Sequence, residues 1–219
     1  MNLINKEFCN LLRNHYLTEN VSLFLYSLIR CTRPQSIIEV GAGYSTLFIS
    51  EAIEDIRRED VKDYPDDIWT RDRDQFIGEG YKPLLTVVEN GEEENHLNPF
   101  SMGDIPLYEN INFVQDDIDN HLTSSQENYD LVWMDFGGGL EFMYYFRKFL
   151  DKLNSGGSII VHSTMGSVAG RLFATELKLL AHDNSELEIM SFVEPHKQLQ
   201  NSFTVIKRMG KYPVYSWSS

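Results

Sequence analysis

The sequence predicts an α/β fold with a seven-stranded, mostly parallel sheet and helices on both faces. From residue 36 onward, short apolar segments alternate with helical patterns, which is typical of strand–helix–strand units and of a Rossmann-like sandwich. The last two expected strands, 187–193 and 202–208, are separated by only eight residues. Because this connection is too short for a crossover helix, we expect a hairpin and therefore one antiparallel strand.

Each expected element follows from its local pattern. Apolar positions at helical spacing between residues 3 and 30 predict one or two amphipathic helices. A strand at 36–40 then leads through a glycine turn into a helix at about 45–56. The other expected strands are 84–89, 111–115, 129–135, 158–162, 187–193 and 202–208, and the other expected helices are 140–153 and about 168–181. A turn at 154–157 is expected to precede the strand at 158–162.

The whole chain, 1–219, is interpreted as a single domain. Residues 35–219 form its core, and residues 1–34 are expected to form a helical lid. Residues 57–83 are a charged, proline-containing stretch that is longer than an ordinary helix-to-strand connection. We interpret this stretch as an insertion, and we expect it to lie with the lid over the ligand-binding edge of the sheet.

Charge and cysteine content exclude several classes of protein. The formal net charge is -14, and residues 83–146 contain thirteen Asp and Glu but no Lys or Arg. A nucleic-acid partner is therefore not expected, because phosphate binding needs clustered basic residues. Only Cys9 and Cys31 are present, and neither a signal peptide nor a membrane span is recognisable. These features predict a cytoplasmic protein that does not bind membranes.

Acidic residues and glycines that could bind a ligand follow or end several of the expected strands. In an open parallel sheet, ligands bind beyond the carboxyl ends of the strands, where the strand order reverses. The residues at such ends are Glu39 with Gly41 and Gly43, then Glu89, Asp116, Asp117 and Asp135. Their coincidence predicts a ligand site at this edge of the sheet.

The glycine turn narrows the choice of ligand. Gly41 and Gly43 let a ligand approach the main chain, and Ser45 opens a helix whose free N–H groups favour an anion. The third glycine of the dinucleotide fingerprint would fall at Thr46, and the Lys-Ser/Thr ending of a phosphate-binding loop is absent. A pyrophosphate ligand is therefore not expected.

The combined pattern resembles the class I S-adenosylmethionine-dependent methyltransferases over roughly residues 35–209. The residues that carry the resemblance are Ile38-Glu39-Val40-Gly41-Ala42-Gly43-Tyr44-Ser45, Glu89, Asp117, Tyr129-Asp130-Leu131-Val132-Trp133-Met134-Asp135 and the Gly156-Gly157 turn. The resemblance implies a sheet of order 3-2-1-4-5-7-6 with strand 7 antiparallel. It also implies S-adenosyl-L-methionine as the cofactor.

The resemblance assigns a part of the cofactor to each strand end. Glu39 and the turn residues hold the methionyl part; these turn residues are Gly41, Ala42, Gly43, Tyr44 and Ser45. Glu89 accepts the ribose hydroxyls, and Asp117 receives the adenine amino group with Ile118 beneath the ring. Asp116 remains a competing choice for Asp117. Gly41 and Glu89 are 48 residues apart, so the Glu89 assignment requires the insertion to loop out.

Two residues are candidates for catalysis. Asp135 stands where the fourth strand ends, and it could position a nucleophile, accept its proton, or only cap the glycine loop that follows. His162 ends the fifth strand and is either a base or a hydrogen-bonded core residue. Metal-dependent catechol-type relatives carry an Asp-Asn pair at this strand end, whereas this chain has His162-Ser163, so no metal site is expected.

The sequence therefore predicts methyl transfer to an N or O nucleophile of a small molecule. Tyr16, Trp69 and Tyr144 are candidates for the substrate pocket. The acidic middle of the chain suits an amine or guanidine substrate, and a homodimer is an open option. Two alternatives remain: an enzyme that consumes S-adenosylmethionine by cyclisation or aminocarboxypropyl transfer, and a binding module without catalysis.

Overall fold

The computed structural model describes residues 18–59, 76–90, 111–136, 141–197 and 201–210. The helices are α2 (Glu19–Thr32), α3 (Tyr44–Arg57), the 3-10 helix η2 (Gly78–Gly80), α5 (Ile118–Ser124), α6 (Phe142–Asp151) and α7 (Val168–Asp183). The strands are β1 (Ser36–Val40), β2 (Leu84–Glu89), β3 (Ile111–Gln115), β4 (Tyr129–Met134), β5 (Leu153–His162), β6 (Leu187–Val193) and β7 (Ser202–Arg208).

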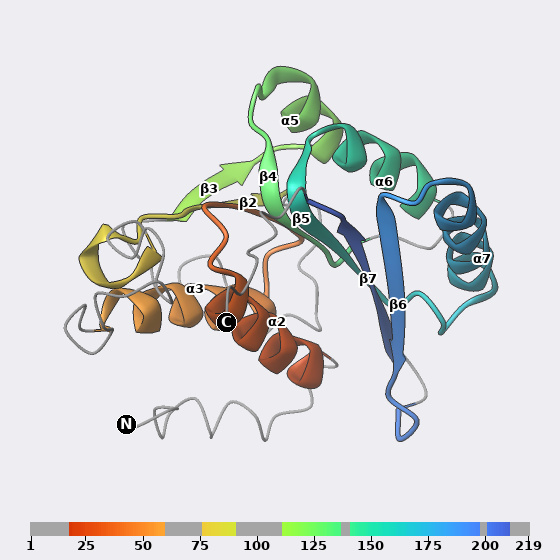
Figure 1. Cartoon of the computed structure of the whole chain (residues 1–219), viewed down its shortest axis with the longest axis horizontal. Coiled ribbons are helices and arrows are strands. Elements are labelled where there is room, and N and C mark those ends of the chain that lie inside the picture. The colour runs from red at the N-terminus through yellow and green to blue at the C-terminus, as the bar shows by residue number, and fades with distance from the viewer. Residues whose placement is uncertain (1–17, 60–75, 91–110, 137–140, 198–200, 211–219) are drawn as a thin grey trace, which may run out of the picture. The chain divides into compact units, whose positions relative to one another are not determined.

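The strand order confirms the predicted fold. The seven strands follow the order β3-β2-β1-β4-β5-β7-β6 (Figure 1). Strand β4 pairs in parallel with β1 and β5, and β3 pairs in parallel with β2, whereas β7 runs antiparallel to both β5 and β6. The chain is therefore Rossmann-like, with the terminal hairpin that the short connection predicted.

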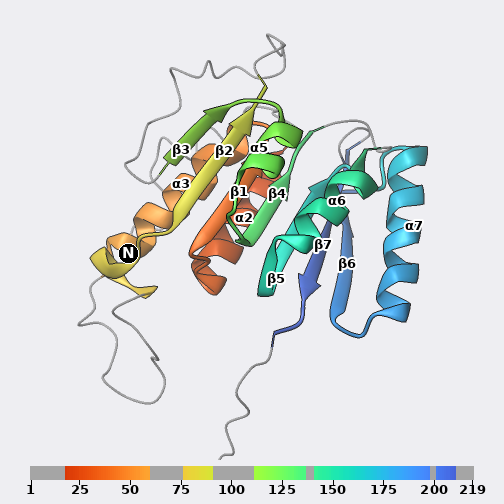
Figure 2. The same ribbon diagram turned by 90° about the horizontal axis from the view of Figure 1, so that it is seen from above.

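The described residues divide into two compact units. Residues 18–35, 41–59, 76–90 and 111–118 form the first unit, and the remaining described residues form the second. In the first unit, β2 and β3 lie side by side and α2 packs along α3 (Figure 2). The apolar faces of the helices meet there, with Phe48 and Leu25 fully buried.

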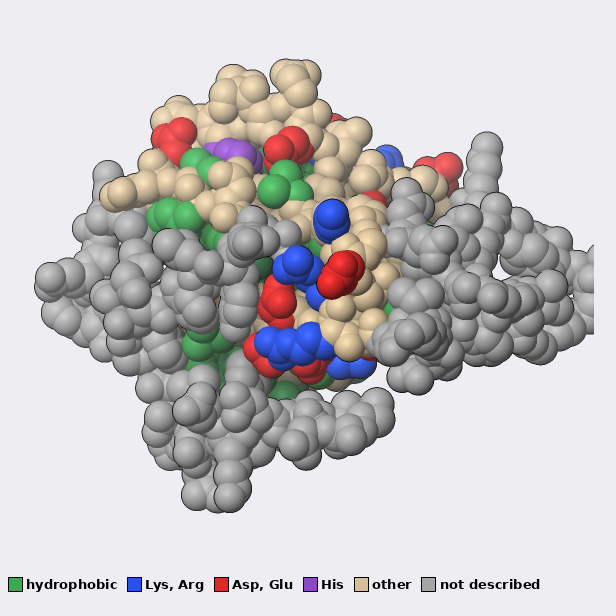
Figure 3. All heavy atoms as spheres, turned by 90° about the vertical axis from the view of Figure 1, so that its left-hand side faces the viewer, with side chains coloured by type: hydrophobic (Ala, Val, Ile, Leu, Met, Phe, Trp, Pro, Cys, Tyr) green, Lys and Arg blue, Asp and Glu red, His purple; other side chains and the backbone are tan. Residues whose placement is uncertain are grey.

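Ion pairs join α2 to α3 in the first unit. Arg30 contacts Asp55 at 3.3 Å and Glu59 at 2.6 Å. Arg33 contacts Glu59 at 2.7 Å and also donates a hydrogen bond to the carbonyl oxygen of Phe76. One guanidinium thus holds residues on both flanks of segment 60–75. Basic and acidic side chains lie interleaved on the face of the molecule that carries the end of α3 (Figure 3).

The second unit contains β1, β4, β5, β7 and β6, with α6 packed on β5 and α7 packed on β6 (Figure 2). Helices α6 and α7 also contact each other, and the ring centroids of Phe142 and Phe173 lie 5.5 Å apart. Trp133 of β4 is fully buried. These apolar contacts fix the positions of the strand ends that carry the polar residues.

Two elements differ from the prediction. Strand β5 begins at Leu153, so the expected turn at 154–157 lies inside it, beside an irregular register with β4. Gly156 has a φ of 83°, and a Cβ on Gly157 would lie 2.9 Å from the carbonyl oxygen of Asn154. The glycine pair therefore permits a bulge and not a chain reversal. Helix α5 was not predicted, because seven residues are too few for a periodic pattern.

Parts of the predicted lid and insertion lie outside the described residues. Only α2 of the lid is described, and segment 60–75 of the insertion is not. The end of the insertion contains η2, whose neighbour Tyr81 donates a hydrogen bond to the carbonyl oxygen of Pro34 at 2.8 Å. No helix in the described ranges is both long enough and apolar enough to cross a membrane.

Candidate functional site

One group of predicted site residues lies in the glycine turn between β1 and α3. Gly41 has a φ of 93°, a conformation that favours glycine, and its N–H donates to the carbonyl oxygen of Val88 at 3.0 Å. The N–H of Gly43 donates to the hydroxyl of Thr46 at 3.0 Å. Thr46 stands at the position of the missing third glycine, and its buried hydroxyl therefore caps the start of α3.

Glu89 lies against this turn. Its Oε2 accepts the N–H of Ala42 at 2.9 Å, although 47 residues separate the two in sequence. Its carbonyl oxygen accepts the N–H of Asp116 at 3.1 Å. The first unit therefore brings together three of the predicted segments: the turn, the end of β2 and the residues 116–118.

The other predicted cofactor residues of this unit differ in exposure. Asp116 accepts the N–H of Asp117 through its own carboxylate at 2.8 Å, whereas Asp117 is exposed and Ile118 is 7% exposed. Tyr44 and Ser45 are 4% and 1% exposed. The Tyr44 ring packs on Phe48 with a centroid distance of 4.9 Å, so the side chain of Tyr44 has a core role.

A second group of predicted site residues lies in the second unit, where β4 and β5 end side by side. Asp135 Oδ1 is 2.7 Å from His162 Nδ1. When the carboxylate is ionised it can only accept, and Nδ1 then donates this hydrogen bond. The N–H of Asp135 donates to the carbonyl oxygen of Val40 at 3.1 Å. Strand pairing therefore carries Asp135 to the end of β1, directly after the predicted cofactor residue Glu39.

The burial of these side chains separates their roles. The side chain of His162 is 4% exposed, whereas that of Asp135 is 24% exposed. The imidazole therefore lies behind the carboxylate, and its ring centroid is 5.6 Å from that of Trp133. Glu39 is fully buried and lies opposite Trp133 in the β1–β4 register. Asp135 is thus the group of this pair that a ligand can reach.

Aromatic residues extend from Asp135 along α6. Phe136 packs edge-on against Tyr145 at 4.9 Å, and Tyr145 packs edge-on against Tyr144 at 5.0 Å. Sequence reasoning missed Phe136 in this row, although its place directly after Asp135 was the available signal. Of the predicted substrate residues, only Tyr144 belongs to the described part of the chain; Tyr16 and Trp69 lie outside it.

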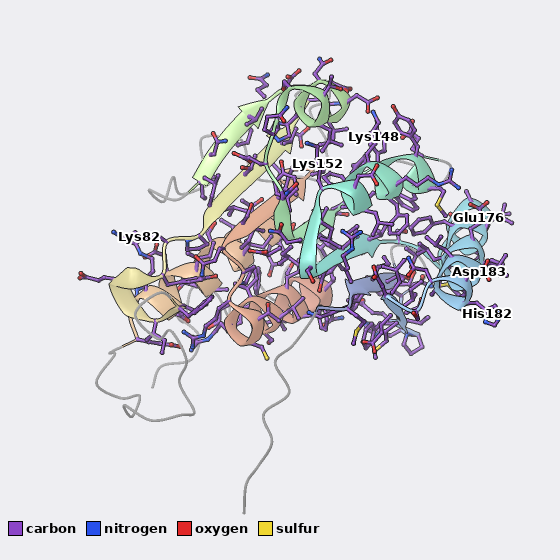
Figure 4. The ribbon with its side chains drawn as sticks, turned by 45° about the horizontal axis from the view of Figure 1, so that its top comes forward. Lys82, Lys148, Lys152, Glu176, His182 and Asp183 are labelled. Atoms are coloured by element: carbon purple, nitrogen blue, oxygen red, sulfur yellow. The ribbon has the colours of Figure 1, made fainter. Side chains whose placement is uncertain are left out.

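Tyr144 is half-exposed and belongs to a surface cluster with Lys148 and Asp119. Its hydroxyl donates to Asp119 at 3.2 Å, and Lys148 Nζ lies 4.4 Å from its ring centroid. Hydrogen bonds, first to Asp119 and then to Tyr144, raise the pKa of Lys148 above its usual range. Lys148 projects from α6 near Lys152 in Figure 4. Among the described side chains, no group of three or more His, Cys, Asp or Glu is arranged to hold a metal.

No protein-family model and no curated protein matches the sequence. Solved structures do match. An O-methyltransferase from Bacillus cereus in complex with S-adenosylhomocysteine aligns with a TM-score of 0.61 and 14% identity, over 86% of this chain and 80% of that chain. The O-methyltransferase TomG from Streptomyces achromogenes, involved in tomaymycin synthesis and bound to S-adenosylmethionine, aligns with a TM-score of 0.60 and 14% identity. That alignment covers 88% of this chain and 81% of TomG.

A third structure bears on the metal question. A candidate caffeoyl-CoA O-methyltransferase from Staphylococcus aureus aligns with a TM-score of 0.57 and 10% identity, over 86% of this chain and 83% of that chain. Proteins of that type depend on a metal, so the exclusion of the metal-dependent branch stays a prediction. At these identities the matches define the fold, which is that of the class I S-adenosylmethionine-dependent methyltransferases.

Proposed function

We propose that the protein is an S-adenosylmethionine-dependent methyltransferase that acts on an oxygen or nitrogen nucleophile of a small molecule. The observation that carries the proposal is the carboxylate of Glu89 on the glycine turn, 2.9 Å from the N–H of Ala42. Together with the fold and with Thr46 at the position of the third fingerprint glycine, it favours S-adenosylmethionine over a dinucleotide at this turn.

The donor and acceptor groups of the turn fit a cationic, hydroxylated ligand. The N–H groups of Ala42 and Gly43 are already bonded to Glu89 and Thr46, so neither is offered to a phosphate. A carboxylate at this position accepts hydroxyl groups and attracts positive charge. A sulfonium compound with a ribose matches these properties. A dinucleotide shares the ribose, but its pyrophosphate would not find the N–H groups of Ala42 and Gly43 free.

The chemistry needs little more than alignment and removal of a proton. When bound, S-adenosylmethionine supplies a methyl group that its positively charged sulfur already makes electrophilic. As the acceptor oxygen or nitrogen forms its bond to the methyl carbon, the carbon–sulfur bond breaks and the acceptor loses a proton. We assign the uptake of this proton to the partly exposed carboxylate of Asp135, which His162 holds by a hydrogen bond of 2.7 Å.

The acceptor itself is defined only by class. Similar solved structures are described as O-methyltransferases, which favours an oxygen nucleophile. The acidic stretch between residues 83 and 146 favours a neutral or cationic molecule, including an amine or guanidine. The lack of Lys and Arg between residues 83 and 146 favours a free small molecule over a nucleic acid.

Calorimetry tests the cofactor and labelling tests the reaction. The protein is titrated with S-adenosylmethionine, with S-adenosylhomocysteine and with NAD, and we expect binding of the first two only. It is then incubated with a methyl-labelled donor and a panel of phenols, amines and amino acids, and products are identified by mass spectrometry. Binding of NAD without binding of S-adenosylmethionine overturns the proposal, and a product that carries the aminocarboxypropyl group identifies the non-methylating alternative.

A further inference from the structure

We propose that Ser202 of β7 is a positioning residue, which fixes the turn after β5 so that His162 keeps its hydrogen bond to Asp135. The catalytic consequence of this proposal rests on the proposed function of Asp135. The geometric part does not, because every contact involved lies within the second unit.

Ser202 binds the turn through two of its own atoms. Its carbonyl oxygen accepts the N–H of Ser163 at 2.6 Å, and its hydroxyl oxygen accepts the N–H of Met165 at 2.7 Å. Ser202 is 1% exposed, so water does not compete for these groups. One residue of an antiparallel strand thus holds alternate N–H groups of the turn that begins directly after His162.

The turn needs such support because its first residue has an unfavourable backbone conformation. Ser163 has a φ of 59°, in the left-handed region that non-glycine residues rarely adopt. Such conformations persist only where surrounding contacts impose them, and they cluster at functional sites. The carbonyl oxygen of Ser202 holds Ser163 itself, and its hydroxyl holds Met165 two residues further on. Without that hydroxyl, we expect the turn to loosen and Ser163 to relax, which rotates the backbone next to His162.

Two further contacts hold the turn from either side. The hydroxyl of Thr164 lies 2.7 Å from that of Thr204, and both residues are fully buried. On α7, a Cβ on Gly170 would lie 2.6 Å from the carbonyl oxygen of Thr164, so the helix packs directly against the turn. His162 is paired with Phe203 in the β5–β7 ladder. Pairing with β7 therefore fixes the backbone at His162, and the contacts of Ser202 and Thr204 fix the turn that follows it.

The chain offers a matched control for the loss of one such hydrogen bond. The hydroxyl of Ser167 accepts the N–H of Gly170 at 2.9 Å at the start of α7. Like Ser202, it is a serine hydroxyl bonded to one backbone N–H, but it does not contact Ser163 or Met165 in any described hydrogen bond. The variants Ser202→Ala and Ser167→Ala each remove one serine hydroxyl that accepts a backbone N–H.

The test combines imidazole NMR with kinetics on the full chain. Ring ¹⁵N spectra of histidine-labelled protein report the protonated Nδ1 of His162, assigned with the variant His162→Gln. His121, buried in the same unit and 3.2 Å from the hydroxyl of Tyr129, serves as an internal reference. We expect Ser202→Ala to shift or broaden the His162 signal and leave the His121 signal in place. Ser167→Ala should change neither.

In the methyl-transfer assay, we expect Ser202→Ala to lower kcat roughly tenfold, because a small displacement of a catalytic group has a large effect on rate. The affinity for S-adenosylmethionine and the KM for the acceptor should stay unchanged, and Ser202→Thr should restore kcat. A His162 signal in Ser202→Ala that matches the one in Ser167→Ala overturns the proposal. If the signal moves but wild-type protein transfers no methyl group, the proposed function fails and the positioning role stands.

A second variant covers the case in which Ser202→Ala does not fold. Thr204→Val removes the hydroxyl that bonds Thr164 and keeps the shape of the side chain. We expect the same change in the His162 signal from this variant. An unchanged signal there overturns the proposal.

Discussion

Two regions of the molecule carry the predicted chemistry, and they are held together in different ways. In the glycine turn, a carboxylate accepts a backbone N–H: Glu89 holds Ala42 at 2.9 Å. At the ends of β4 and β5, two side chains hold each other: Asp135 and His162 at 2.7 Å. We propose that the first arrangement shapes a cofactor-binding surface and that the second orients a reactive group.

This difference implies that substitutions in the two regions have separable effects. Changes at the turn should alter the affinity for the cofactor, because they alter the shape of the main chain that would contact it. Changes at Asp135 should alter turnover, because the pair contributes a group that acts during the reaction. A single variant that lowered cofactor affinity and turnover equally would contradict this separation of roles.

The largest effect is expected from Asp135→Asn. Asparagine retains an oxygen that can accept the Nδ1–H of His162, but it lacks the basicity of a carboxylate. We therefore expect kcat to fall roughly 100-fold, as for the loss of a general base. The dissociation constant of S-adenosylmethionine, measured by calorimetry, should stay unchanged.

Asp183→Asn is the control for loss of one negative charge. Asp183 is exposed at the end of α7, where its side chain points away from the sheet (Figure 4). We expect wild-type kcat from this variant. A wild-type rate in Asp135→Asn as well would remove Asp135 from the catalytic assignment.

The next largest effect is expected at Glu89. Glu89→Ala leaves the Ala42 N–H without its charged acceptor, a hydrogen bond worth about 1.5–3 kcal/mol. Binding of S-adenosylmethionine should then weaken by roughly tenfold to 100-fold. Glu89→Gln should fall between this variant and the wild type, because the amide oxygen still accepts the N–H but carries no charge.

Glu79→Gln tests whether these changes are specific. Glu79 is exposed on η2 in the same unit, so its neutralisation should leave cofactor affinity at the wild-type value. Equal weakening by Glu79→Gln and Glu89→Gln would show that the effect is one of total charge. The proposed role of Glu89 in cofactor binding would then be wrong.

A substitution at Arg33 should lower stability without affecting either region. Arg33→Ala removes contacts to Glu59 and to the carbonyl oxygen of Phe76 from a side chain that is 18% exposed. We expect the free energy of unfolding to fall by about 1–2 kcal/mol, with binding and turnover unchanged. Arg58→Ala, from a side chain that is 59% exposed, should cost only about 0.5 kcal/mol. Equal losses in denaturant titrations of the two variants would contradict the special role of Arg33.

The sequence was sufficient for the fold because the fold follows from patterns that are local. Alternation of strands and helices, and the short connection before β7, predict the sheet and its reversed strand. The extent of β5 was missed because a Gly-Gly pair indicates either a turn or a bulge. The choice between them depends on the pairing of β5 with β4, which is a long-range contact.

The candidate site was predicted residue by residue but not as a set of contacts. Asp135 and His162 were each proposed from their places at strand ends, yet their hydrogen bond depends on the adjacency of β4 and β5. Nothing local distinguishes Ser202 from any other serine in a strand, and the left-handed Ser163 has no glycine to mark it. Side-chain contacts between distant segments were therefore the part that the sequence could not supply.

The smallest effect, and the finest test of the comparison, is expected at Tyr144. Its hydroxyl bonds Asp119 at the surface, whereas its ring ends the aromatic row that begins at Phe136. Tyr144→Phe removes only the hydroxyl, and we expect a change in unfolding free energy within about 0.5 kcal/mol and an unchanged KM for the acceptor.

Tyr144→Ala removes the ring. If the aromatic row lines the acceptor site, the KM for the acceptor should rise several-fold in this variant while cofactor affinity stays constant. Because Lys148 also contacts the ring, Lys148→Met is the control for loss of that contact. An unchanged KM in Tyr144→Ala would limit the row to a packing role and leave Asp135 as the only residue of this unit assigned to the acceptor.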